Sequence, residues 1–557
     1  MNTAVRTRMP VLWVGIWAAL VALALETRPI LPMDETRYVS VAWEMWRDGQ
    51  FLVPHLNGEP YSHKPPLLFW LMTAGWAAFG VNDWWPRLVA PLFGLASLVM
   101  IEMLAGRLWP GRPGLAAAAP LLLLGGLFWC LFTSLTMFDM LVTACALLGL
   151  LGLLRAWHRE GIAGFVVFGF AFGLGVLAKG PAIALHILPL ALLAPLWGPR
   201  LATSGGELKQ PPGGWWRWYL GLGASVGFGV LIGLAWAVPA AIVGGEDYGR
   251  AIFWGQSAGR MVDSFAHERP WWWFLAVLPG MLLPWTIWPQ VWRSVWVGVR
   301  GALVDGGVRF CLCWMVFALV AFSAISGKQL HYLLPEMPAF ALLIAAFLFH
   351  AAPVDGAARW RWDLWPSAGF VVVACVAVMA LPVLSLFTDP PPWADNLASA
   401  WALIGVAAVV AVLLRSPDGL LSRVTILASL TAILVAIVHL VAQPTLAKTF
   451  DLSPVAARLA AWERDGYALA NFGKYHGQFH FLGRLRTPMP AIGLTADDQS
   501  DWLAGHDKGK VVSYQRTLPA DAVPDLVAPF LGRSIVVWDA EVVRTHPTAP
   551  YRGGDAD

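Results

Sequence analysis

The sequence is poor in charged residues. Only 13% of its 557 residues are Asp, Glu, Lys or Arg, whereas soluble domains carry about 25%. A chain made only of soluble domains is therefore excluded, because their surfaces would lack the charge that keeps them in water. The net charge of +3 is also too small to indicate a nucleic-acid-binding protein.

Cysteine is scarce as well. All five cysteines fall inside apolar stretches, where neither disulfides nor thiolate metal sites are expected: Cys130, Cys145, Cys311, Cys313 and Cys375. A Gly-rich phosphate-binding loop of specific form is missing too. The sequence thus gives no evidence for redox chemistry or for a nucleotide cofactor.

Hydrophobic residues, in contrast, make up 58% of the chain, and 33 are Trp. Apolar stretches long enough to cross a bilayer recur as far as Val441, and we interpret them as about thirteen membrane-spanning helices. We therefore predict an all-α polytopic membrane protein. Its transmembrane domain covers residues 1–441, including an outer loop over 26–87 with interfacial helices. Residues 442–557 have a soluble composition and are expected to form a small α/β domain.

The positive charges predict the orientation. If Pro65 to Phe79 is a helix lying in the interface, every short connector on the N-terminal side carries basic residues, for example Arg107 and Arg155. The opposite connectors are near-neutral or acidic. The positive-inside rule then places the N-terminus in the cytoplasm and the tail outside.

A polar cluster follows the first apolar stretch. A helix from Asp34 to Asp48 would place Asp34, Arg37 and Tyr38 on one face. Either Asp34 or Glu35 could then take a proton from an acceptor hydroxyl. The alternative is structural: Asp34 caps the helix and Glu35 faces solvent.

Further charged residues are predicted at the same membrane surface. They are Lys64, Asp139, Lys179, Arg260 and Lys328. Cations beside carboxylates suit a reaction with a lipid phosphate leaving group, because they neutralise the charge that develops on it. The competing hypothesis is a transporter or lipid flippase that uses these charges as a headgroup path. Against it, the apolar stretches hold few ionisable groups, chiefly Glu102, His186 and His439.

These motifs, in this order, resemble the type C membrane glycosyltransferases (GT-C). They resemble in particular the dolichyl-phosphate-mannose protein mannosyltransferase-like group, which includes bacterial lipid A 4-amino-4-deoxy-L-arabinose transferases. The resemblance rests on five segments: Asp34 to Tyr38, Lys64-Pro65-Pro66, Phe138-Asp139, Lys179-Gly180-Pro181, and Lys328 to Pro335. It implies transfer of a sugar, with inversion, from a polyprenyl (undecaprenyl) phosphate to a lipid, glycan or protein acceptor. The site would lie on the periplasmic face of the bacterial inner membrane.

The resemblance also implies roles for single residues. Asp34 matches an essential first-loop carboxylate and Asp139 a second outer-face acid, and we add Glu35 to this catalytic group. The residues expected to bind the lipid phosphate or donor are Lys64, Arg37, Tyr38, Arg260, Lys328 and Lys179. The residues expected to line the cavity are Tyr61, His63, Gln256, His331 and Tyr332.

The sequence departs from the arabinose transferases at two places that bear on metal binding. His63 stands where those enzymes usually have Glu, and Gln256-Ser257 stands where they tend to have Glu-His. Their metal site is therefore not transferable. His63 and His267 remain as imidazole donors, so a divalent metal is left open and no cofactor is assigned.

The tail contains segments typical of short strands. We expect strands over Gly466 to Phe472, Gln478 to Leu482, Lys510 to Tyr514 and Ser534 to Val543. One of them overlaps a polar-aromatic group, Tyr475, His476, Gln478 and His480. This group either contacts the acceptor or forms an ordinary strand edge.

Overall fold

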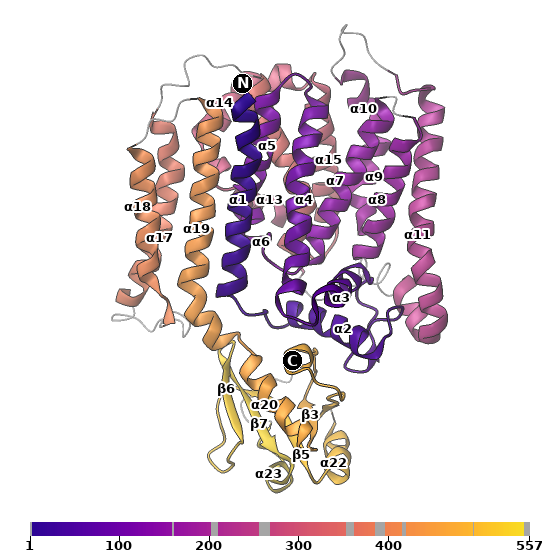
Figure 1. The fold of residues 1–557 in the computed structure, drawn as a ribbon, viewed down its shortest axis with the longest axis vertical. Helices are drawn as coiled ribbons and strands as arrows, with labels where there is room; N and C mark the ends of the chain where they lie inside the picture. Colours follow the sequence, from indigo (N-terminus) through magenta and orange to yellow (C-terminus); the bar gives the residue numbers. More distant parts are fainter. Residues whose placement is uncertain are drawn as a thin grey trace.

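The computed structural model is a bundle of apolar helices with a small sheet domain at one end (Figure 1). The N-terminus lies at the opposite end of the bundle from this sheet domain. The structure describes residues 3–158, 161–201, 210–254, 268–351, 361–384, 396–414, 419–493 and 495–550. An all-α membrane region with a separate C-terminal domain is thus confirmed.

The helices of the bundle follow the apolar stretches of the sequence. They are α1 (Thr3–Thr27), α4 (Trp84–Leu108), α5 (Pro113–Leu124), α6 (Leu127–Phe132), α7 (Phe138–Trp157), α8 (Ala163–Lys179), α9 (Ala182–Leu192), α10 (Ala194–Trp197), α11 (Gly214–Arg250), α13 (Trp273–Met281), α14 (Pro289–Ala302), α15 (Gly306–Ala324), α16 (Met337–Ala346), α17 (Trp365–Leu384), α18 (Ala402–Leu413) and α19 (Leu420–Thr449).

Eight helices of the described residues are long and apolar enough to cross a membrane, or nine if one bent pair is a single span. The expected number of about thirteen is not confirmed. One reason is that several expected spans are shorter helices, among them α5 with 12 residues and α8 with 17, whereas a span has about 20. The predicted domain boundary at Val441 lies within α19, which continues to Thr449.

Two helices outside the bundle lie at the end that faces the sheet domain (Figure 1). They are α2 (Asp34–Asp48) and α3 (Leu67–Phe79), and a hairpin of β1 (His55–Leu56) and β2 (Glu59–Pro60) lies between them in the sequence. The carboxylate of Glu44 in α2 holds this hairpin. It accepts hydrogen bonds from the backbone N–H groups of Asn57 (2.5 Å) and Gly58 (2.9 Å).

The C-terminal domain is an α/β domain around one five-stranded sheet. Its strands lie in the order β4-β3-β5-β7-β6; β3 is parallel to β4 and β5, whereas β7 is antiparallel to β5 and β6. The elements are α20 (Ser453–Arg464), β3 (Ala468–Phe472), α21 (His480–Gly483), β4 (Ala491–Ile492), α22 (Ala496–Gly505), β5 (Gly509–Gln515), β6 (Leu526–Phe530), β7 (Arg533–Asp539) and α23 (Ala540–Thr545).

The strand expected over Gln478 to Leu482 is wrong, because this segment contains the short helix α21. A strand with one buried face would alternate buried and exposed side chains. Here Gln478, Phe479, His480 and Phe481 are all buried. Phe479 packs in the core of the sheet domain, whereas the ring of Phe481 stacks on Trp76 of α3 with centroids 5.3 Å apart. The segment is buried from both sides because it joins the two domains.

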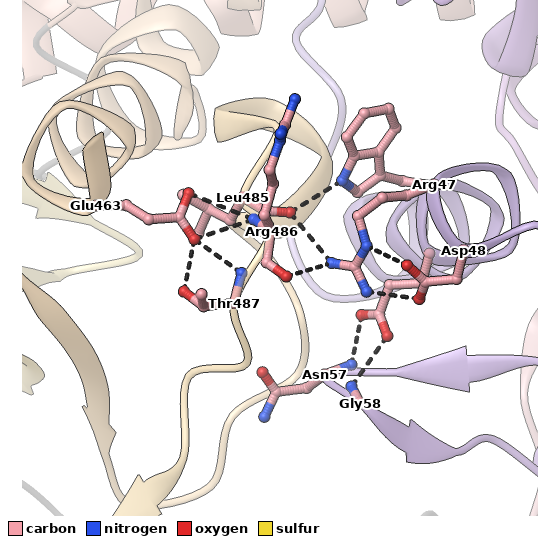
Figure 2. A network of polar contacts seen from close by, with 10 residues as sticks. Arg47, Asp48, Asn57, Gly58, Glu463, Leu485, Arg486 and Thr487 are labelled. Atoms are coloured by element: carbon pink, nitrogen blue, oxygen red, sulfur yellow. Dashed lines mark hydrogen bonds and ion pairs between the residues drawn. The ribbon is translucent and has the colours of Figure 1, made fainter. Parts of the chain in front are cut away.

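Polar contacts hold the sheet domain against α2 and the hairpin (Figure 2). Asn57 donates from its side-chain amide to the carbonyl of Met489 (2.8 Å) and accepts from the Met489 N–H (2.7 Å). The guanidinium of Arg47 donates to the carbonyl of Arg486 (2.9 Å), and the indole N–H of Trp43 donates to the carbonyl of Leu485 (3.1 Å). The sheet domain is thereby tied to the helix that begins at Asp34.

Candidate functional site

The first turn of α2 brings Asp34, Arg37 and Tyr38 together. The guanidinium of Arg37 forms an ion pair with the Asp34 carboxylate, and the Tyr38 hydroxyl donates to the same oxygen at 3.3 Å. The N-cap of α2 is Met33 without a side-chain hydrogen bond, so the alternative of Asp34 as a cap is wrong. The Asp34 side chain is 55% exposed. A reactant can therefore reach its carboxylate.

Tyr38 enters this group as a neutral phenol. Burial raises its pKa well above the ordinary value, and the negative charge of Asp34 adds to the rise. The hydroxyl therefore keeps its proton at neutral pH and donates a hydrogen bond to Asp34. Its ring packs edge-on against Phe138 with centroids 4.9 Å apart, next to Asp139 in the sequence. Tyr38 thus links the first turn of α2 to the start of α7.

Glu35 points away from this open group. Its buried carboxylate forms an ion pair with Arg28 and accepts backbone hydrogen bonds from Leu31 (2.9 Å) and Thr136 (2.7 Å). Burial alone would raise the pKa of Glu35, but Arg28 and the two N–H donors hold it below the ordinary value. The alternative that Glu35 faces solvent is wrong.

Asp139 and Lys179 form a second pair at the ends of α7 and α8. The ammonium lies 2.6 Å from the carboxylate, and the Asp139 side chain is 4% exposed. Lys179 also lies over the ring of Tyr332, 4.9 Å from its centroid. Asp139 lies in the first turn of α7, and Lys179 is the last residue of α8. Consecutive antiparallel helices place these two ends at the same surface, as expected from the sequence.

Lys64 and His331 lie within electrostatic range of this pair. Asp139 interacts with Lys179, His331 and Lys64, and His331 interacts in addition with Asp34. Tyr61 belongs to the same surroundings, because Arg37 and Tyr38 both interact with it, and its ring stacks on His63 with centroids 5.2 Å apart. The residues expected from five separate segments therefore form one cluster.

Lys328 has its contacts elsewhere. Its ammonium donates to the backbone carbonyls of Arg269 (3.0 Å) and Ser326 (3.5 Å), and to that of Ile325. Burial lowers its pKa. In this structure it holds two connectors together. Three other expected residues, Gln256, Arg260 and His267, lie outside the described residues.

The described donors do not form a metal site. Within the described ranges, no group of three or more His, Cys, Asp and Glu side chains could hold a metal ion. His63, one of the two expected imidazole donors, stacks on Tyr61 instead.

Two buried pairs have partners that reasoning from sequence did not identify. Arg28 was not singled out, although it pairs with Glu35 and donates to the carbonyl of Ser134 at 2.8 Å. Glu336 was also missed; it lies 2.6 Å from the imidazole of His186 inside the bundle. The only signal in the sequence was a charged or titratable residue just after an apolar stretch, as at Arg28, or inside one, as at His186 and Glu336.

Comparison with known proteins identifies relatives of the chain. A family model described as dolichyl-phosphate-mannose-protein mannosyltransferase matches residues 63–208. The undecaprenyl phosphate-alpha-4-amino-4-deoxy-L-arabinose arabinosyl transferase of Pectobacterium atrosepticum is 30% identical over 421 residues, which are 72% of this chain and 70% of the relative. The protein of the same name from Pseudomonas aeruginosa (strain LESB58) is 29% identical over 391 residues, 67% of this chain and 66% of the relative, slightly under two thirds of its length.

The fold matches across almost the whole chain. The crystal structure of ArnT from Cupriavidus metallidurans in the apo state superposes with a TM-score of 0.74 at 20% identity and covers 96% of this chain and 98% of that one. The structure of the same protein bound to undecaprenyl phosphate gives a TM-score of 0.71 at 21% identity, with 95% and 97% covered. The architecture is that of a multi-pass membrane protein of the GT-C class.

At the level of sequence the relation is more specific. The chain belongs to the family of the undecaprenyl phosphate-alpha-4-amino-4-deoxy-L-arabinose arabinosyl transferases.

Proposed function

We propose that the protein transfers a sugar from an undecaprenyl-phosphate carrier to an acceptor at the outer face of the bacterial inner membrane. The observation that carries the proposal is the placement of Asp34. Its exposed carboxylate lies beside Arg37 and within electrostatic range of His331, which also interacts with Lys64 and Lys179. Carboxylate and cations at one membrane surface suit an acceptor hydroxyl and a lipid phosphate leaving group.

The chemistry follows from which carboxylate is accessible. Asp34 takes the proton of an acceptor hydroxyl, and the acceptor oxygen forms a bond to the anomeric carbon of the donor. The bond from that carbon to the phosphate oxygen breaks, and the phosphate leaves with the electron pair. Because attack and departure occur on opposite faces of the sugar, the configuration inverts. Arg37 and Tyr38 orient the Asp34 carboxylate.

Asp139 has a different task in this proposal. It is buried against Lys179, so it holds that ammonium in place instead of receiving a proton from the acceptor. Lys179 and Lys64 then provide the positive charge that stabilises the departing phosphate. The ring of Tyr332 lies next to Lys179, and Tyr61 interacts with Arg37. Glu35 acts through position only, because its carboxylate is occupied by Arg28 and Thr136.

The names of the relatives point to 4-amino-4-deoxy-L-arabinose as the sugar, and we propose it as the first donor to test. The family's link to lipid A makes phosphorylated lipid A the first acceptor to test. The orientation belongs to the same proposal: the N-terminus lies in the cytoplasm and the sheet domain in the periplasm. It is supported by their positions at opposite ends of the bundle (Figure 1).

A transfer assay tests the proposal. Purified protein in lipid nanodiscs is incubated with undecaprenyl-phosphate-linked sugar and lipid A, and mass spectrometry detects the glycosylated lipid. We expect product formation with release of undecaprenyl phosphate. If the protein instead moves the intact carrier between leaflets of a vesicle without consuming it, the flippase hypothesis is correct and the enzyme hypothesis fails.

A further inference from the structure

A loop of the sheet domain lies directly against the helix that carries Asp34. The hydroxyl of Ser40 in α2 donates to the carbonyl of Gly477 (2.6 Å) and accepts from the N–H of Phe481 (3.1 Å). Ser40 is fully buried, so this contact is shielded from water. Residues 473–477, which we name the tail loop, are thereby fixed against α2.

The backbone of the tail loop is held in a single shape. Gly473 and Gly477, at its two ends, have φ angles of 75° and 74°, which side-chain-bearing residues rarely adopt. The buried amide of Asn471 donates to the Gly473 carbonyl at 3.0 Å. A Cβ at Gly477 would lie 2.3 Å from Leu56 of the hairpin. Both ends of the loop are therefore fixed by contacts, one of them with the membrane domain.

One side chain of this loop, His476, lies within electrostatic range of the Asp34 group. His476 is half-buried and interacts electrostatically with both Asp34 and Arg37. Burial, together with the positive charges of Arg37 and Lys474, lowers its pKa, so the imidazole is neutral at pH 7 and can donate or accept a hydrogen bond. Lys474 is exposed beside it.

We infer that the tail loop forms the acceptor side of the site, with Lys474 and His476 binding an anionic group of the acceptor next to its attacking hydroxyl. The inference rests on the proposed function and deepens it. In the proposed function, Lys64 and Lys179, which both interact with Asp139, bind the carrier phosphate. The tail loop instead packs on α2, the helix that begins at the exposed Asp34, so we place the acceptor on this side.

The chemistry of this side fits an anion. A lysine ammonium binds phosphate or carboxylate as a point charge, and the imidazole adds a directed hydrogen bond. A charge-assisted hydrogen bond contributes enough binding energy for about a tenfold change in affinity. The loop residues act on acceptor binding and not on the reacting bond, so they are specificity-determining residues.

The test measures acceptor and carrier separately with the full-length protein in nanodiscs. The variants are Lys474→Ala and His476→Ala. The matched controls are Lys508→Ala and His546→Ala. Both residues lie in the same domain, Lys508 just before β5 and His546 just after α23. Steady-state rates give the acceptor KM for phosphorylated lipid A, and native mass spectrometry gives direct binding of lipid A and of undecaprenyl phosphate. We expect each loop variant to raise the acceptor KM and Kd about tenfold, while carrier Kd and the controls stay within about twofold of the wild type.

The outcomes separate the two proposals. Dephosphorylated lipid A should bind the wild type as weakly as phosphorylated lipid A binds the loop variants. If acceptor Kd is unchanged in both loop variants, or if lipid A does not bind to the wild type, the inference is overturned. An equal loss of carrier affinity also overturns it. Failure of the proposed function looks different: the wild type makes no product, whatever the lipid A binding of the variants.

Discussion

The carboxylate of Glu35 accepts a hydrogen bond from the backbone N–H of Thr136 at 2.7 Å. This contact joins two parts of the chain that are far apart in the sequence, and each part carries one of the two acids of the site. Glu35 directly follows Asp34, and Thr136 lies shortly before Asp139 at the start of α7. We therefore propose that Glu35 is a positioning residue that sets the separation of the two acids.

Replacement Glu35→Gln should lower stability and activity together. It removes the charge that pairs with Arg28 and leaves that guanidinium buried without a counter-charge, which costs about 3 kcal/mol or more. The midpoint of thermal unfolding in detergent should fall, and the transfer rate should fall at least about tenfold. The variant Glu541→Gln, on the exposed face of α23, is the control. A fully active and equally stable Glu35→Gln protein contradicts the positioning role.

The same pair predicts a pH dependence. The pKa of Glu35 is lower in the folded protein than its ordinary value of 4.5. Its contribution to stability is therefore complete above pH 4.5 and is lost as the pH falls through the lower, folded-state pKa. Thermal unfolding from pH 7 down to pH 3 should show a steeper loss in the wild type than in Glu35→Gln. Parallel curves would exclude a charged Glu35 in the folded state.

Asp139 and Lys179 should behave as a coupled pair. Asp139→Asn leaves a mostly buried ammonium without its partner, and Lys179→Met leaves a buried carboxylate without its partner, so each change should cost about 3 kcal/mol of stability. The double variant should cost less than the sum of the two single changes. Unfolding midpoints of all four proteins complete the cycle. Additive costs would show that the two groups do not interact.

The contact between the domains can be tested at two glycines. Gly58 has a φ of 81°, and a Cβ there would lie 3.0 Å from Pro488 of the sheet domain. Gly49 has a φ of 66° and no atom within 4 Å of such a Cβ. Both replacements by Ala strain the backbone, so the difference between them isolates the contact. Gly58→Ala should unfold at lower temperature than Gly49→Ala and should speed amide exchange at residues 486–489. Equal behaviour would show that the domains do not meet there.

Part of the site could be predicted because it depends on residues that are close together in the sequence or on the position of a residue in an apolar stretch. Helical spacing placed Asp34, Arg37 and Tyr38 on one face, and the ends of apolar stretches placed Asp139 and Lys179 at one surface. Both groupings are present. The role of Glu35 could not be predicted, because Thr136 approaches it only in the folded chain. The contacts of Lys328 could not be predicted for the same reason. Charge and topology predict its side of the membrane, whereas its hydrogen bonds to connector carbonyls depend on packing.

The tail shows the same limit for secondary structure. Segments of the strands β3, β5 and β7 were predicted from apolar runs bounded by turns, and these strands are present. The strand expected over Ser534 to Val543 is too long, because β7 ends at Asp539 and helix α23 begins at Ala540. The run at Gln478 to Leu482 has a similar composition but enters helix α21 at His480, since both the sheet core and α3 bury it. Tertiary contacts of this kind are not contained in a local pattern. The number of spans also depends on packing, because short helices such as α5 and α8 fit among longer ones.

The central claim is that the exposed carboxylate of Asp34 is the base of a sugar transfer. The most direct test is the variant Asp34→Asn, which keeps the size of the side chain and removes its ability to take a proton. Its transfer rate from undecaprenyl-phosphate-linked sugar is compared with its Kd for undecaprenyl phosphate. We predict that transfer falls at least about a hundredfold while the Kd stays within about twofold of the wild type. An unchanged transfer rate would contradict the assignment of Asp34 as the base.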